Sequence, residues 1–171
     1  ITYSPAANYN GSDSLTVVAS DGQGGTTTAT LSMTITPVND PPTMSAVDTQ
    51  TSDDSALSLP LNANDIDGNS LTFSIGATNA AHGVASIAGS SLSYTPSKDF
   101  NGTDDLSISV SDGAGATIEV PVQIEILPVN DAPTAAALEF VVDQGTTLGV
   151  SAADGLLAGA ADIDEDSLTV D

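Results

Sequence analysis

The sequence predicts an all-β protein made of tandem seven-stranded Greek-key β-sandwiches. Three observations lead to this prediction: short runs alternate apolar with polar residues, Thr, Ser, Val, Leu, Ile and Ala dominate the composition, and one domain-sized set of motifs recurs. Hydrophobic residues make up 40% of the 171 positions, so the chain can bury a core. No apolar run reaches the roughly 18 residues of a membrane-spanning helix.

The motifs recur with a period of 91 residues. The matched ranges are 3–5 with 94–96, 9–13 with 100–104, 20–22 with 111–113, and 37–43 with 128–134. Further on, Asp65 and Asp67 match Asp162 and Asp164 at an offset of 97. The last copy therefore carries about six additional residues, near positions 155–160.

This register divides the chain into five parts. Residues 1–38 are the C-terminal part of one repeat, 39–43 a linker, 44–129 a complete repeat, 130–134 a second linker, and 135–171 the N-terminal part of a third repeat. Prolines stiffen both linkers and exclude them from sheet interiors. Because the chain starts and stops within a repeat, we expect it to be a piece of a longer protein. The partners we expect are adjacent repeats of the same polymer, with the half-repeats completed by the continuing chain or by neighbouring copies.

Within the complete repeat, alternation and turn signals predict seven strands. Their ranges are 44–51, 57–61, 71–75, 84–87, 92–94, 106–110 and 117–127. Gly89 and Ser90 predict a hairpin turn between the fourth and fifth strands. This number of strands in about 90 residues is typical of a Greek-key sandwich. Only residues 154–161, in the third repeat, suggest a helical turn.

The charge of the chain excludes several partners. Acidic residues number 23 against a single basic residue, Lys98, giving a net charge of −22. Nucleic acids and anionic membrane surfaces require cationic side chains, so neither is expected as a partner, and no membrane insertion is expected. The absence of Cys excludes disulfides, thiol catalysis and Cys-based zinc sites.

The acidic residues form short clusters on predicted turns, beside Gly and Asn. The clusters are at 53–54, 65–69, 104–105, 130–131 and 162–166. Asp and Asn are common turn formers, which accounts for any one cluster alone. Carboxylates spaced at i and i+2 also suit a hard cation with oxygen ligands, Ca²⁺ before Mg²⁺. The fixed offset between clusters favours the metal interpretation for the set as a whole.

Several segments carry a family resemblance. Residues 17–22 with 35–42 resemble the end of a cadherin repeat, and 61–69 resemble the cadherin Asp-x-Asp loop. The Tyr-x-Pro, Phe-Asn-Gly-x-Asp and Pro-Val-Asn-Asp-Ala-Pro motifs resemble bacterial cadherin-like tandem repeats of giant secreted adhesins, including the RTX type. The resemblance implies seven-stranded cadherin/Ig-like sandwiches joined end to end, an extracellular or cell-surface location, and Ca²⁺ clamped at each junction.

The resemblance also implies the ligands of each junction. For the first junction they are Asp13, Asn39, Asp40, Asp65, Asp67, Asn69 and Asp112. For the second they are Asp53 or Asp54, Asp104 or Asp105, Asn130, Asp131, Asp162, Asp164 and Asp166. Asp21 would serve a junction before residue 1. The chain departs from animal cadherins in having no Arg, so Asn-Gly-x-Asp stands where those proteins have Leu-Asp-Arg-Glu.

These observations predict calcium-stiffened spacer modules of a secreted or cell-surface bacterial adhesin. Two alternatives remain open: the repeat unit of a polymeric extracellular filament, and a carbohydrate- or protein-binding module. The chain is not expected to be an enzyme. The paired aspartates resemble those of a glycosidase, but they recur with the repeat, whereas an active site is normally built once. His82, the single histidine, has no counterpart in the other copy.

Overall fold

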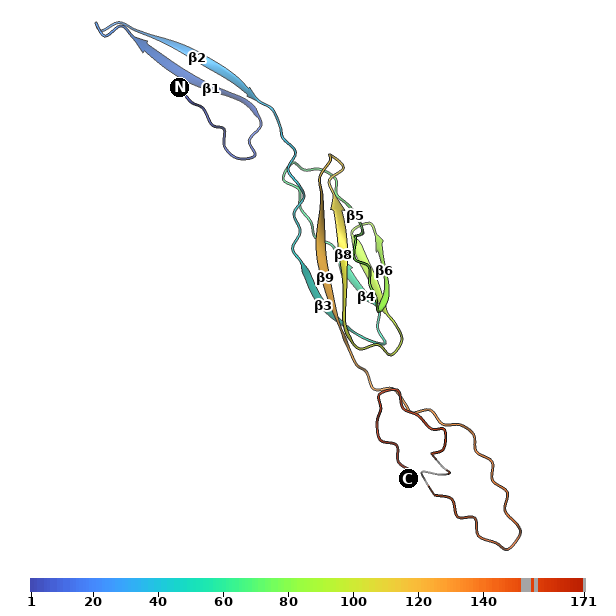
Figure 1. The fold of residues 1–171 in the computed structure, drawn as a ribbon. Helices are drawn as coiled ribbons and strands as arrows, with labels where there is room; N and C mark the ends of the chain where they lie inside the picture. The colour runs from blue at the N-terminus through green and yellow to red at the C-terminus, as the bar shows by residue number, and fades with distance from the viewer. Residues whose placement is uncertain (152–154, 156, 171) are drawn as a thin grey trace.

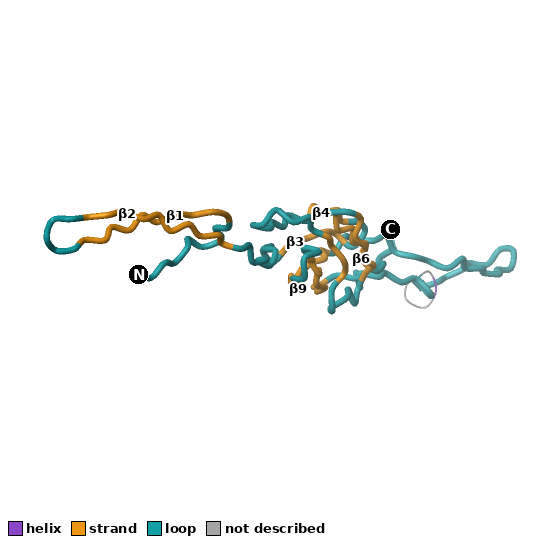
Figure 2. Tube along the Cα trace, turned by 90° about the horizontal axis from the view of Figure 1, so that it is seen from above, coloured by secondary structure: helices purple, strands orange, loops and turns teal. Residues whose placement is uncertain are grey.

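The computed structural model describes residues 1–151, 155 and 157–170. Every named element is a strand, and the three segments follow one another along an extended line from the N-terminal hairpin to the third segment (Figure 1). Figure 2 shows the same arrangement from a perpendicular direction. No helix in the described part of the chain is long and apolar enough to cross a membrane.

The central segment folds into a sandwich of two sheets. The strands are β3 (Val47–Ser52), β4 (Leu57–Pro60), β5 (Thr72–Ile75), β6 (Gly83–Ala88), β7 (Ser91–Pro96), β8 (Gly102–Ser111) and β9 (Thr117–Leu127). One sheet has the order β3-β9-β8-β5 and the other the order β4-β7-β6. Neighbouring strands are antiparallel except β3 and β9, which are parallel. The predicted all-β sandwich is confirmed, as are all seven of its strands.

Alternation along the strands builds the core of this sandwich. In β9 the even-numbered residues from Val120 to Ile126 are at most 2% exposed, whereas their odd-numbered neighbours face solvent. Leu106, Ile108 and Val110 of β8 occupy the facing positions of the adjacent strand. Burying a large aliphatic side chain contributes about 2 kcal/mol, so these two strands supply much of the stability.

The first segment is a hairpin of β1 (Gly11–Ser20) and β2 (Thr26–Ile35). These strands match β8 and β9 at the 91-residue offset, and they pair in the same way. No other strand packs on this two-stranded sheet in the described residues. Apolar side chains that match buried residues of the central sandwich are therefore partly exposed. Leu31, which matches buried Val122, is 46% exposed.

The third segment has no named strand among its described residues. In the central sandwich, β3 is held by hydrogen bonds to β9. The corresponding residues 138–143 have no such partner, so the backbone stays irregular although the sequence alternates. The helical turn predicted for residues 154–161 includes positions outside the described residues. The division into five parts stays a prediction.

Candidate metal centres at the two linkers

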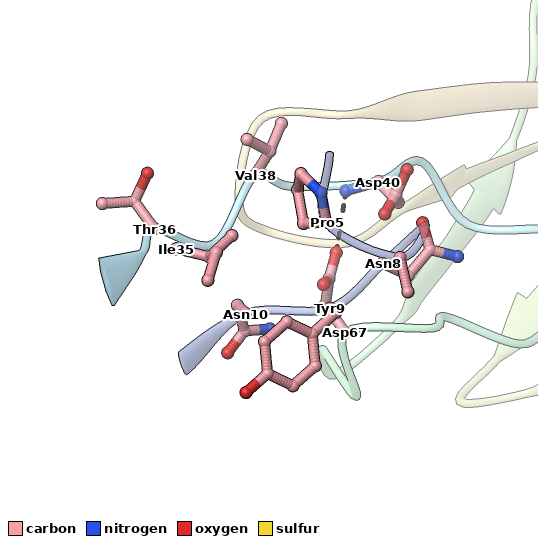
Figure 3. A pocket seen from close by; sticks show the side chains of 10 residues that line it. Pro5, Asn8, Tyr9, Asn10, Ile35, Thr36, Val38, Asp40 and Asp67 are labelled. Atoms are coloured by element: carbon pink, nitrogen blue, oxygen red, sulfur yellow. Dashed lines mark hydrogen bonds between the residues drawn. The ribbon is translucent and has the colours of Figure 1, made fainter. Parts of the chain in front are cut away.

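The first linker is pinned to the loop between β4 and β5. Thr43 and Asn64 exchange two backbone hydrogen bonds of 2.7 and 2.8 Å. Three residues earlier, the Asp40 N–H donates to Asp67 Oδ2 at 2.7 Å (Figure 3). Linker and loop are therefore held together on both sides of the two prolines at 41 and 42, of which Pro42 is buried.

Asp65 organises this loop with one of its two carboxylate oxygens. Its Oδ1 accepts hydrogen bonds from the backbone N–H groups of Asp67 (2.9 Å) and Asn69 (3.1 Å). Gly68 has φ +78°, a left-handed conformation that glycine adopts without steric cost. Asp65 Oδ2 is buried without a hydrogen-bond donor. A buried carboxylate oxygen with no partner costs about 1–3 kcal/mol and calls for an ion or another donor.

Asn39 connects the linker to the loop between β8 and β9. Its Nδ2 donates to Asp112 Oδ2 at 2.6 Å, and its Oδ1 accepts from Asn69 Nδ2 at 2.9 Å. Asp112 is only 4% exposed, and its Oδ1 accepts the N–H groups of residues 114, 115 and 116 at 2.8–3.0 Å. The bond from Asn39 is the main cause that holds the pKa of Asp112 below its usual range, with the backbone donors adding to it.

The second linker repeats the bonds between the first linker and the Asp-x-Asp loop. The Asp131 N–H donates to Asp164 Oδ2 at 2.7 Å, and Asp162 Oδ1 accepts from the N–H groups of Asp164 (3.0 Å) and Asp166 (3.3 Å). Thr134 and Ala161 form the bridge that Thr43 and Asn64 form at the first linker. At the position of Gly68 stands Glu165, held at φ +63°. A non-glycine residue in this conformation persists only where its surroundings fix the loop.

Asp53, from the loop between β3 and β4, reaches the second linker from the preceding sandwich. Its backbone N–H donates to the Leu127 carbonyl at 3.1 Å, and its Oδ2 accepts from the Val129 N–H at 3.3 Å. The side chain is buried, and its Oδ1 has no hydrogen-bond partner. Among the described residues, each linker thus adjoins one orphaned carboxylate oxygen, Asp65 Oδ2 at the first and Asp53 Oδ1 at the second.

A further residue, Asp99, adjoins the second linker and was not among the sequence candidates. It lines a pocket with Asp131 and Asp162, and both its oxygens accept from Lys98 Nζ, at 2.7 and 2.8 Å. The matching pocket at the first linker is lined by Asn8, Asp40 and Asp67 (Figure 3). Asn8 and Asp99 share φ values of +59° and +58°. The repeat register, extended one residue before Tyr9 and Phe100, pairs these two positions.

Acidic groups crowd this second pocket. Burial is the largest cause that raises the pKa of Asp131, followed by the charges of Asp99 and Asp54. Asp164 adds to the increase, and Lys98 opposes it. The same charges raise the pKa of Lys98, chiefly through Asp99. The side chain of Lys98 is 82% exposed, so this pair contributes little stability by itself.

Two predicted ligands, Asp13 and Asp104, lie apart from these networks. Asp104 is 2% exposed within β8, where Oδ1 accepts from the Ala81 N–H (2.9 Å) and Oδ2 from the His82 N–H and Tyr94 Oη (both 2.8 Å). Burial opposes its ionisation, but these three donors hold its pKa below the usual range. Asp104 therefore fastens the loop before β6 to the core.

Asp13 has the equivalent arrangement in the first segment. Its oxygens accept from Tyr3 Oη and from the Ser14 N–H. The bond to Asp13 is the main cause that raises the pKa of Tyr3 to about 12. The Tyr–Asp hydrogen bond therefore recurs with the repeat, as Tyr3 to Asp13 and Tyr94 to Asp104. The carboxylates of both aspartates accept hydrogen bonds from groups outside the linkers.

The donor atoms at both linkers are carboxylate, amide and backbone oxygens, which suit a hard cation such as Ca²⁺. In the described residues, no group of three or more Asp, Glu or His side chains is arranged to hold a metal ion. At the first linker, amide N–H groups occupy part of the space between the acids, since Asn39 donates to Asp112 and Asn69 donates to Asn39. The two orphaned oxygens and the all-oxygen donor set fit a divalent cation.

Sequence comparison identifies the family. The profile of the bacterial Ig domain matches residues 1–34 and 39–125. The chain belongs to the bacterial Ig domain family. No curated protein sequence is significantly similar to this bacterial Ig chain.

Among solved structures, the bacterial Ig chain is similar to human mucin-like protocadherin EC1-2, at 16% identity and a TM-score of 0.49, over 75% of this chain and 74% of that one. It is also similar to the human desmocollin-1 ectodomain, at 15% identity and a TM-score of 0.45, over 78% and 29% of the two chains. An endo-fucoidan hydrolase of glycoside hydrolase family 107 matches at 19% identity and a TM-score of 0.45, over 73% of this chain. The chain spans only 20% of the length of that hydrolase. An RTX-type adhesin origin stays a prediction.

Proposed function

We propose that this chain is a run of calcium-stiffened spacer modules from a secreted or cell-surface bacterial adhesin. The observation that carries the proposal is the set of bonds between linker and Asp-x-Asp loop, which occurs at both linkers. A buried carboxylate oxygen without a donor lies beside each linker, Asp65 Oδ2 at the first and Asp53 Oδ1 at the second. Turn formation alone accounts for the bonds of Asp65 Oδ1 and Asp162 Oδ1. It does not account for carboxylates that converge from a linker and from two loops of different strands.

The ligands proposed for the first junction come from the linker and from the two loops of the following sandwich. They are Asn39, Asp40, Asp65, Asp67, Asn69 and Asp112. The ligands proposed for the second junction include two loops of the preceding sandwich. They are Asp53, Asp54, Asp99, Asn130, Asp131, Asp162, Asp164 and Asp166. Asp13 and Asp104 are not included, because their oxygens accept hydrogen bonds from groups away from the linkers. Asp99 is included because it lines the pocket with Asp131 and Asp162.

Repulsion among the carboxylates of the junction favours a bound cation. Two carboxylates about 5 Å apart repel by roughly 3 kcal/mol at an effective dielectric constant near 20. Lys98 is the single basic side chain of the 171 residues, so the first junction has no cation of its own. A bound Ca²⁺ ion supplies positive charge shared by the linker and the loops around it, and at the second junction these loops come from both neighbouring segments. The residues around it fix the direction in which one sandwich follows the other.

The tyrosines favour a spacer over a carbohydrate-binding module. Sugar-binding sites use exposed aromatic rings, but Tyr94 is fully buried. The hydroxyl groups of Tyr3 and Tyr9 donate to Asp13 and to the Ser12 carbonyl. Tyr94 is therefore a core residue, whereas Tyr3 and Tyr9 are 37% and 42% exposed and are held by hydrogen bonds within the repeat motif.

Asp67→Ala is expected to reduce the number of Ca²⁺ ions bound at the first junction and to leave the second unchanged. Asp67 Oδ2 ties the loop to Asp40, and the two junctions lie at opposite ends of a sandwich, where effects are independent. Isothermal titration of the 171-residue chain measures the ion count. The matched variant Asp164→Ala should remove ions from the second junction alone, and an unchanged count in both variants would remove this pair from the ligand set.

A further inference from the structure

Lys98 is the single basic side chain among the 171 residues, and it lines the pocket beside the second linker. Asp99 and Asp131 line the same pocket. At the first linker, the 91-residue register places Ala7 and Asn8 at the positions that Lys98 and Asp99 hold at the second. The two linkers share their bonds to the Asp-x-Asp loop, so this ion pair is a property of one junction and not of the repeat.

The ammonium group of Lys98 occupies both carboxylate oxygens of Asp99. Lys98 Nζ donates to Oδ1 at 2.8 Å and to Oδ2 at 2.7 Å. Carboxylate oxygens are also the ligands of a hard cation such as Ca²⁺, which binds either one or both oxygens of a carboxylate. In this structure Lys98 therefore holds the two donor atoms that Asp99 would offer to an ion.

The charge of Lys98 acts on several carboxylates of the junction. The hydrogen bonds and the charge of Asp99 are the main causes that raise the pKa of Lys98, and the charges of Asp131 and Asp54 add to the increase. Asp54 lies between β3 and β4, Asp99 lies between β7 and β8, and Asp131 lies in the linker. One ammonium group thus offsets part of the repulsion among carboxylates from three segments of the chain.

Lys98 is exposed, and the fold of its loop does not depend on it. Its side chain is 82% exposed, whereas that of Asp99 is 18% exposed. An ion pair with so exposed a partner contributes little stability, because solvent screens it. The backbone of Asp99 has φ +58°, and Asn8 has φ +59° at the matching position with no lysine beside it. Asp99 can therefore keep its place when the ammonium group leaves.

Asp53 shows that Lys98 does not satisfy the whole junction. This aspartate is 7% exposed, its Oδ2 accepts from the Val129 N–H, and its Oδ1 has no donor. In the described part of the chain, the hydrogen bonds of Lys98 Nζ go to Asp99 and not to this buried oxygen. A Ca²⁺ ion carries twice the charge of an ammonium group and takes six to eight oxygen ligands. It can therefore satisfy more of the junction than Lys98 does.

We infer that Lys98 is the resident counter-ion of the second junction, which holds Asp99 when no metal ion is bound and is displaced when Ca²⁺ binds. The inference rests on the proposed calcium function and adds a regulation to it. Because an incoming ion must displace a like charge, the second junction binds Ca²⁺ less tightly than it would without this lysine.

Calorimetric titration with Ca²⁺ tests this on the 171-residue chain and on Lys98→Met, which keeps a long side chain but removes its charge. Ions of the second junction should bind roughly three- to tenfold more tightly in the variant, because no ammonium group opposes them. The difference should become smaller at high ionic strength. In the background Asp164→Ala, which impairs the second junction, the same substitution should leave the remaining affinity unchanged.

A variant of matched charge separates the local effect from the net charge. The double variant Lys98→Met/Ser86→Lys places the lysine at an exposed position within β6, so the net charge stays at −22. Its affinity for Ca²⁺ should rise as much as that of Lys98→Met. An affinity equal to that of the unchanged chain, in either variant, would overturn the inference.

A second measurement follows the lysine itself. Because the chain has one lysine, labelling with lysine carrying ¹³C at Cε gives a single NMR signal. In chelator, this signal should differ from that of Asp99→Asn, a variant that places at position 99 the residue found in the first repeat. Ca²⁺ should move the signal of the unchanged chain to the Asp99→Asn position as the second junction fills.

The outcomes distinguish this inference from the proposed function. A lysine signal that stays in place while the chain binds Ca²⁺ would overturn the inference and leave the proposed function intact. Absence of Ca²⁺ binding by the unchanged chain would overturn both.

Discussion

Removal of Ca²⁺ is expected to shorten the chain's maximum dimension and to make its linkers sensitive to proteases, while the central sandwich stays folded. The 11 residues of β9, at about 3.4 Å each, give a sandwich close to 40 Å long. Without an ion, each five-residue linker lies among like charges and the sandwiches take many relative angles. With an ion, the linker and the loops beside it share ligands, and one angle is favoured. At one hundred times Kd, binding adds about 2.7 kcal/mol to the stability of the folded junction.

Small-angle scattering and limited proteolysis, each in millimolar Ca²⁺ and in chelator, measure this response. The double variant Asp65→Ala/Asp162→Ala should behave in Ca²⁺ as the unchanged chain does in chelator. The double variant Asp48→Ala/Glu125→Ala removes the same charge from exposed strand positions and should retain the full response. Equal dimensions and equal cleavage of the unchanged chain in both conditions would mean that the clustered acids are only surface charge.

Asp104→Ala is expected to lower the free energy of unfolding of the central sandwich by about 3 kcal/mol. The change leaves the Ala81 and His82 N–H groups and the Tyr94 hydroxyl without their acceptor, and each unsatisfied buried group costs about 1–3 kcal/mol. For a domain of this size the melting temperature should fall by roughly 12–24 °C. Thermal and denaturant unfolding followed by circular dichroism measure both quantities. The neighbouring variant Asp105→Ala loses one exposed bond from Gln123 and should change stability by less than about 0.5 kcal/mol.

The same carboxylate makes stability depend on pH. Its pKa is lower in the folded state than the roughly 3.9 of an unfolded aspartate, so its contribution is complete above that value. The contribution is lost as the pH falls through the folded-state pKa. The melting temperature should therefore be level near neutral pH and fall below about pH 4, less steeply in Asp104→Ala. Parallel curves for the two proteins would show that Asp104 is not responsible.

The strands could be predicted closely because a half-buried strand shows its period in the sequence. The prediction for β9 matches the structure at both ends, 117–127. The prediction for β8 began at 106, four residues late. Asp104 has the same parity as Leu106, Ile108 and Val110, so it lies on the inward face of the strand. Alternation in apolar residues alone cannot show a buried acid, because its burial depends on donors from another loop and strand.

The residues of the candidate sites were harder to predict from the sequence than the strands. The linker and the Asp-x-Asp loop could be paired because both recur with the repeat, and the structure joins them through Asp40 and Asp67. The hydrogen bond from the Tyr94 hydroxyl to Asp104 joins strands of two different sheets. It could not be predicted from the sequence, because strand order within each sheet does not show which side chains meet between the sheets. Asp99 was overlooked because its counterpart, Asn8, carries no charge.

That difference between Asn8 and Asp99 has a consequence for how a long array yields under load. The first junction has the neutral pair Ala7 and Asn8, whereas the second has Lys98 and Asp99 at the same positions. At the second junction, the Lys98 ammonium group and a metal ion would compete for the Asp99 carboxylate. The first junction has no such competition, because Ala7 and Asn8 stand at these positions. Successive joints would then soften at different calcium concentrations. Substitutions at the positions of Lys98 and Asp99 would thus change the stiffness of each junction separately, without altering the sandwiches.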